Sequence, residues 1–133
     1  MGLTDFTRQT VIARREIAEW LQQEMWYWTG TFDIPAWSYY ETDIWTAPAD
    51  RRLVVEFFHP SASSRRFQGW VDLRDVLGSE VYRFAGTYLW GACPLALRYP
   101  LSPNHTLRIR IENYDPCATR RFRVAVEGYT EPV

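Results

Sequence analysis

From Trp26 to the C-terminus, the chain consists of short runs of β-branched and aromatic residues that Pro, Gly, Asp and Ser interrupt. Runs of this kind, spaced by roughly 8 to 12 residues with no helical pattern between them, are typical of antiparallel β-sandwiches and barrels. The predicted strands span residues 27–34, 37–46 with a break, 52–58, 66–72, 81–90, 94–99, 105–113 and 120–128. A short helical turn that Gly78 ends is expected at 72–77. The sequence therefore predicts a mainly β fold, with a jelly-roll-like antiparallel sandwich over residues 26–133.

Residues 5–25 differ from the rest because their apolar residues recur at three- and four-residue steps, which indicates an amphipathic helix. Its charges oppose the helix dipole: Arg8, Arg14 and Arg15 lie in the first half, whereas the glutamates lie in the second. Packing of the apolar stripe must therefore hold this helix. We expect residues 1–25 to form a helical arm outside the sandwich that contacts a partner subunit.

The last two predicted strands alternate between apolar and charged residues, so each has one face for the core. The core-facing residues are Leu107, Ile109, Ile111, Phe122, Val124 and Val126. If the two strands form a hairpin, a register that sets Glu112 beside Arg123 gives an attractive cross-strand pair. Arg110 then has no partner in the hairpin and is a candidate contact residue. In a true jelly roll the two strands can belong to opposite sheets, and this register would not apply.

Charge and hydropathy exclude several classes of partner. The net charge is −1, and all 15 basic residues are arginine, which is either a bias of GC-rich coding or an adaptation to interfaces. A net charge so close to zero does not favour binding to the negatively charged backbone of nucleic acid. No apolar run reaches the roughly 18 residues of a membrane span, and the N-terminus lacks a signal-peptide pattern. We expect a soluble product of the cytoplasm without nucleic-acid or membrane partners.

The residues that could supply catalysis or bind metal are few and poorly spaced. Cys93 and Cys117 lie in turn-like settings and are expected to be free thiols, and neither forms a ligand pattern with His59 or His105. No nucleotide-binding or metalloprotease motif occurs, and the acidic residues show no pattern specific to glycoside hydrolysis. The sequence therefore predicts no catalytic residue, no metal and no cofactor.

The richest segment is "MWYWTGTFDIPAWSYYETDIW", residues 25–45, in a chain with seven tryptophans. The candidate contact residues in it are Trp26, Trp28, Trp37, Tyr39 and Tyr40. Strand alternation places Trp26 and Trp28 on one face, and it points Tyr40 away from the face that Trp37 and Tyr39 share. About half of these aromatics are expected to fill the core. The others either anchor a protein interface or stack on sugar rings.

The closing run "YPLSPNHTLRIRIENYDPCATRRFRVAVEGY", residues 99–129, resembles the small β-sandwich accessory proteins of tailed-bacteriophage virions, such as decoration proteins and head, neck or tail attachment proteins. The resemblance is a pattern of strands and turns, so no functional residue is carried over. It implies a non-enzymatic structural protein of the virion, made in the host cytoplasm. Such a protein would bind other virion proteins and copies of itself through its aromatic segment, its arm and its arginine-rich sheet face. The alternative is a carbohydrate-binding module that uses Trp28, Trp37, Tyr39 and Tyr40, and an enzyme ranks third.

Overall fold

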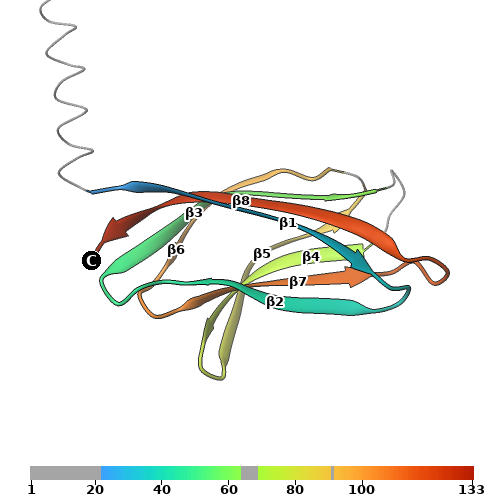
Figure 1. Cartoon of the computed structure of the whole chain (residues 1–133), viewed down its shortest axis with the longest axis horizontal. Helices are drawn as coiled ribbons and strands as arrows, with labels where there is room; N and C mark the ends of the chain where they lie inside the picture. Colours follow the sequence, from blue (N-terminus) through green and yellow to red (C-terminus); the bar gives the residue numbers. More distant parts are fainter. Residues whose placement is uncertain (1–21, 64–68, 91) are drawn as a thin grey trace, which may run out of the picture.

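The computed structural model describes residues 22–63, 69–90 and 92–133. These residues form eight strands: β1 (Glu24–Ile34), β2 (Tyr39–Thr46), β3 (Arg51–Ala62), β4 (Gly69–Leu77), β5 (Glu80–Leu89), β6 (Leu95–Leu101), β7 (Thr106–Asn113) and β8 (Arg120–Pro132). Sheet A has the order β1-β8-β3-β6, and sheet B has the order β2-β7-β4-β5. Figure 1 shows the two antiparallel sheets as stacked layers, with the hairpin of β4 and β5 projecting from sheet B.

The strand pairs are nested, because β1 pairs with β8, β2 with β7, β3 with β6 and β4 with β5. Eight strands rolled up in this way form two four-stranded sheets, as in a jelly roll. The predicted β-sandwich is therefore confirmed, and each predicted strand overlaps an observed one. The predicted helical turn at 72–77 is wrong, since β4 continues to Leu77 and the left-handed Gly78 (φ +60°) begins the turn into β5.

The predicted helical arm is only partly open to comparison with the structure. Its residues 5–21, with Arg8, Arg14 and Arg15, lie outside the described residues. Its last four residues were predicted wrongly: Gln22 and Gln23 are not helical, and Glu24 and Met25 belong to β1 and pair with Thr130 and Tyr129 of β8. Strand pairing thus overrides the helical pattern at its C-terminal end. No helix long and apolar enough to cross a membrane occurs in the described part of the chain.

The core lies between the two sheets. Leu107, Ile109 and Ile111 of β7 are fully buried, and Phe122, Val124 and Val126 of β8 are at most 2% exposed. The prediction that these six side chains face the core is confirmed. The hairpin register is wrong, because β7 lies in sheet B and β8 in sheet A. The two apolar faces meet across the sandwich, which buries both, whereas neighbouring strands in one sheet would only set them side by side.

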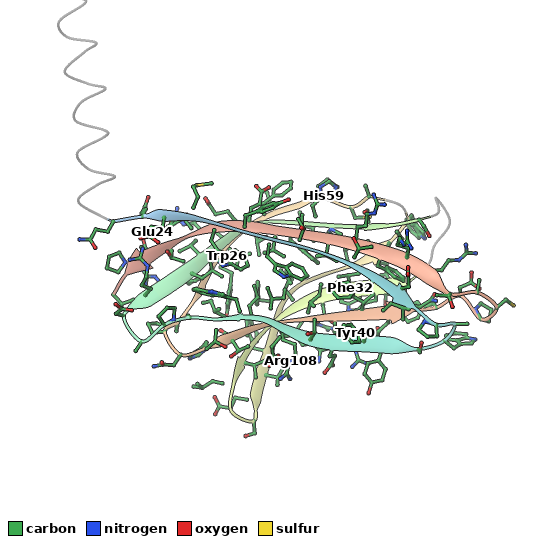
Figure 2. The ribbon with its side chains drawn as sticks, viewed as in Figure 1. Glu24, Trp26, Phe32, Tyr40, His59 and Arg108 are labelled. Atoms are coloured by element: carbon green, nitrogen blue, oxygen red, sulfur yellow. The ribbon has the colours of Figure 1, made fainter. Side chains whose placement is uncertain are left out.

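Aromatic side chains close the open edge between β1 and β2, the edge strands of the two sheets. Trp26 contacts Trp45 with ring centroids 5.8 Å apart, and Phe32 contacts Tyr40 at 5.4 Å. Trp28 lies beside Phe32 across Gly30, where an added Cβ would come within 2.6 Å of the indole. Figure 2 shows Trp26 and Phe32 pointing into the space between the layers. These rings extend the core to the edge of the sandwich.

Candidate binding face

The outward side of sheet B carries three rows of side chains that the strand register brings together. One row joins Tyr39, Glu112, Trp70 and Tyr88, and the next joins Glu41, Arg110, Asp72 and Gly86. The third joins Asp43, Arg108, Arg74 and Arg83. Each strand contributes alternate residues, so their neighbours in sequence face the core. We call this surface the sheet B face.

Charged side chains tie the sheet B face together through hydrogen-bonded ion pairs. Arg110 donates to Glu41 at 2.6 Å and to Glu112 at 3.2 Å, while Arg108 donates to Asp43 at 2.7 Å. Burial disfavours the charge of Arg110, but the bonds to Glu41 and Glu112 outweigh it and raise the pKa of its guanidinium. The carboxylates and guanidiniums therefore hold one another in fixed positions.

Asp72 is fully buried although it lies on the outward side of β4. Its carboxylate accepts bonds from Arg74 Nε at 2.8 Å and from the indole Nε1 of Trp70 at 2.6 Å. Gly86 on β5 leaves room for that indole, because a Cβ there would lie 2.4 Å from the ring. A buried carboxylate requires such partners. Asp72 thus fixes the orientation of Trp70.

A run of aromatic rings borders the ion pairs, and we call it the aromatic row: Trp37, Tyr114, Tyr88 and Trp70. Successive ring centroids are 6.3, 6.5 and 4.9 Å apart. Trp37 is 67% exposed and Tyr88 55% exposed. Tyr39, 62% exposed, lies on the same face under the guanidinium of Arg110. Large rings are thus displayed to solvent on a surface whose polar groups are already paired.

Trp37 adopts a left-handed backbone conformation with φ +52°, which costs a bulky residue free energy. Its amide donates to the carbonyl of Asp115 at 3.1 Å, so the loop between β7 and β8 holds it in place. Asn113, 1% exposed, donates to the carbonyls of Ile34 and Pro35 just before this turn. The fold therefore imposes the exposure of Trp37, and strain of this kind is concentrated at functional sites.

Tyr114 joins the aromatic row to the ion pairs. Its hydroxyl donates to Glu112 at 2.7 Å. Burial, and next the bond to Glu112, raise the pKa of Tyr114 to about 12. The neutral phenol is therefore the form that the folded protein favours at ordinary pH.

The structure separates the five aromatic residues among the predicted contacts into three groups. Trp37 and Tyr39 lie on the sheet B face, and Tyr40 points away from it toward Phe32, as the alternation predicts. Trp26 and Trp28 are half-buried and pack against the core. Arg110 was expected to be unpaired within a hairpin of the last two strands. That hairpin does not form, and Arg110 bonds to Glu41 of β2.

Sequence reasoning missed Trp70, Tyr88 and Tyr114. The sequence does carry a signal for Trp70, namely strand alternation: Trp70 and Asp72 share the outward side of β4, and the buried Val71 lies between them. Tyr88 likewise precedes the buried Leu89. Nothing in the sequence states that β5, β4 and β7 are neighbours, so the contact between these rings could not be predicted.

Asp75 is the centre of a second group of hydrogen-bonded polar side chains. His105 Nδ1 lies 2.6 Å from Asp75. The other oxygen of Asp75 accepts from the Tyr99 hydroxyl at 2.6 Å, and this bond links β4 of sheet B to β6 of sheet A. Cys93 and Cys117 are not bonded to each other. Within residues 22–63, 69–90 and 92–133, no three His, Cys, Asp or Glu side chains are placed to hold a metal ion.

No protein-family model matches the chain, and no curated protein matches it. A solved structure described as the crystal structure of PirA aligns with 74% of this chain and 92% of its own chain, at 13% sequence identity and a TM-score of 0.46. Similarity at this level does not transfer a function.

Proposed function

We propose that the protein is a non-enzymatic structural protein of a phage particle that binds neighbouring capsid or tail subunits in a multi-copy assembly, with the sheet B face as its contact surface. The observation that carries the proposal is the aromatic row together with Tyr39, displayed beside an array of paired arginines. Trp, Tyr and Arg are the residues that dominate the binding energy of protein interfaces.

The rigidity of the sheet B face supports binding to a protein surface. Because Arg110, Arg108 and Arg74 are already paired with carboxylates, docking would immobilise few additional side chains. Ordering a long side chain at an interface costs roughly 0.5 to 1.5 kcal/mol, and here the fold has already met that cost. A prearranged face of this kind suits repeated contacts between identical subunits.

The assignment to a phage particle is supported by the resemblance of residues 99–129 to virion accessory proteins. This run supplies the end of β6, then β7 and β8, which are nested in a jelly-roll order. The proposed partners are other virion proteins and further copies of this chain. The proposed location is the virion, after synthesis in the host cytoplasm.

The test compares the assembly state of the full chain with that of two variants of matched exposure. Tyr39 is 62% exposed on the sheet B face, and Tyr27 is 63% exposed on sheet A. We expect mass measurement and electron microscopy of the wild type and Tyr27→Ser to show rings or larger assemblies, and Tyr39→Ser to show smaller species. Equal assembly of the two variants, or a monomeric wild type in the presence of particle proteins, would reject the proposal.

A carbohydrate-binding module is the second candidate, and the display of Trp37 favours it. An exposed indole held in a strained turn offers a ring face, while the carboxylates and guanidiniums nearby can bond to hydroxyl groups. In this reading the ligand would lie along the aromatic row. Binding on a glycan array, with quenching of tryptophan fluorescence that Trp37→Gly abolishes, would select this candidate over a protein contact.

A further inference from the structure

The outer side of sheet A contains a hollow at the end where β8 begins, opposite to the sheet B face. It consists of two adjoining cavities of about 220 and 290 Å³ that share Ser61 and Arg123. The first is also lined by Thr29, Gly30, Thr31, His59, Val124 and Ala125, and the second by Ala62, Ser63 and Arg121. Figure 2 shows His59 on the side of sheet A that faces away from sheet B.

Strand register explains why this part of the sheet is hollow. Thr29 of β1, Ala125 of β8 and His59 of β3 form one row across the three strands. In the next row, Thr31 and Ser61 flank Arg123. Four of these six side chains are small, and they leave the space that the first cavity occupies.

The hollow is lined by cationic side chains. Among the described residues, its lining includes Arg121 and Arg123 and no carboxylate. Arg121 is held by Asp33, with bonds of 2.9 and 3.3 Å. Arg123 is exposed, and no ion pair with a described residue involves it. Glu127, the next carboxylate along β8, is four residues away, about 13 Å at the rise of a β-strand.

We infer that the hollow binds an oxyanion group, namely a sulfate, phosphate or carboxylate, that belongs to a larger ligand. The planar guanidinium of Arg123 can pair with two oxygens of such a group, and Thr31 and Ser61 can donate from their hydroxyls. A water molecule occupies about 30 Å³ in the liquid, so cavities of this size admit the anion and part of the molecule that carries it. The inference concerns the opposite sheet and does not rest on the proposed function.

The experiment titrates the full chain with sodium sulfate, sodium phosphate and sodium acetate at constant ionic strength, followed by amide chemical shifts in nuclear magnetic resonance spectra. We expect saturable shifts at Thr31, Ser61 and Arg123 with at least one anion, and the anion that binds most tightly identifies the ligand class. Arg123→Gln should weaken that binding by roughly tenfold or more.

Arg98→Gln is the matched control, since Arg98 is an exposed arginine on β6 of the same sheet. It should bind the anion as the wild type does. Linear, unsaturated shifts with all three anions, or equal weakening in the two variants, would overturn the inference. Thermal melting of both variants shows whether the fold is kept. If Arg123→Gln does not fold, the anion titration is carried out with Arg123→Lys, which keeps the charge but loses the planar guanidinium.

Discussion

The guanidinium of Arg110 lies over the ring of Tyr39, with its central carbon 3.9 Å from the ring centroid. The same guanidinium donates to Glu41 and Glu112, so one side chain joins an exposed ring to two carboxylates on different strands. This contact connects the ion pairs of the sheet B face to its aromatic surface, and it makes Arg110 the residue whose removal changes both.

We expect Arg110→Gln to lower the free energy of unfolding by about 1 to 2 kcal/mol, because two half-exposed carboxylates lose charge-assisted bonds that solvent partly screens. Urea denaturation measures the change. Arg83→Gln is the control, since Arg83 is exposed and its guanidinium lies over Trp70 at 5.1 Å. Its cost should stay within about 0.5 kcal/mol. Equal costs for the two variants would show that the ion pairs of Arg110 contribute nothing beyond an exposed cation–π contact.

Asn113 is the second residue on which the sheet B face depends. Its buried side chain donates to the carbonyls of Ile34, Pro35 and Ala118 at 2.9 to 3.1 Å and accepts from the amide of Asp115. Asn113→Ala should cost about 2 to 4 kcal/mol in urea denaturation, because it leaves several buried polar groups without partners. Asn104→Gly is the control, because Asn104 is exposed in a left-handed turn (φ +68°) that glycine tolerates. A small cost for Asn113→Ala would mean that water replaces the amide.

Trp37→Gly should separate stability from binding. Glycine tolerates the left-handed backbone, which offsets the lost contact with Tyr114. We therefore expect the free energy of unfolding, measured by thermal unfolding, to be higher than that of the wild type or lower by at most about 1 kcal/mol. The same variant should lose binding of the partner, whether that is a protein subunit or a glycan. Trp37→Ala is the comparison, since it removes the ring but keeps the strain, and it should be the less stable of the two. A large loss of stability in Trp37→Gly would show that the ring is structural.

Prediction from sequence succeeded where it depended only on the residue pattern within a single strand. The alternation of Leu107, Ile109 and Ile111 identified their buried face, and the segment around Trp26 and Trp28 was expected to divide between core and surface. Alternation depends only on the geometry of a single strand. The same pattern of turns and β-branched residues also located all eight strands.

Prediction failed where it required knowledge of which strands are neighbours. Glu112 was set beside Arg123 on the assumption that consecutive strands form a hairpin, but the connection between them crosses from sheet B to sheet A. Residues 72–77 were expected to form a short helical turn that Gly78 ends, but they belong to β4. The carboxylates of Asp72 and Asp75 are buried in β4, where Trp70 and Arg74 bond to Asp72, and Tyr99 and His105 contact Asp75. The partners of Asp75 lie 24 and 30 residues away along the chain, so a local pattern does not reveal them.

Tyr114 should make the stability of the protein sensitive to alkaline pH. Its pKa is raised from 10.0 to about 12 in the folded state, so the neutral phenol stabilises the fold fully below pH 10, and this contribution is lost as the pH rises toward 12. Tyr114→Phe removes this titration together with the bond to Glu112. We therefore expect the variant to be less stable than the wild type near pH 8 and the difference to shrink between about pH 10 and pH 12, as measured by urea denaturation across that range. The pKa of Tyr99 is also raised, because burial and the bond to Asp75 disfavour its phenolate, but this effect is common to both proteins. Parallel stability curves for the two proteins up to pH 12 would show that burial and the bond to Glu112 do not hold the Tyr114 phenol in its neutral form.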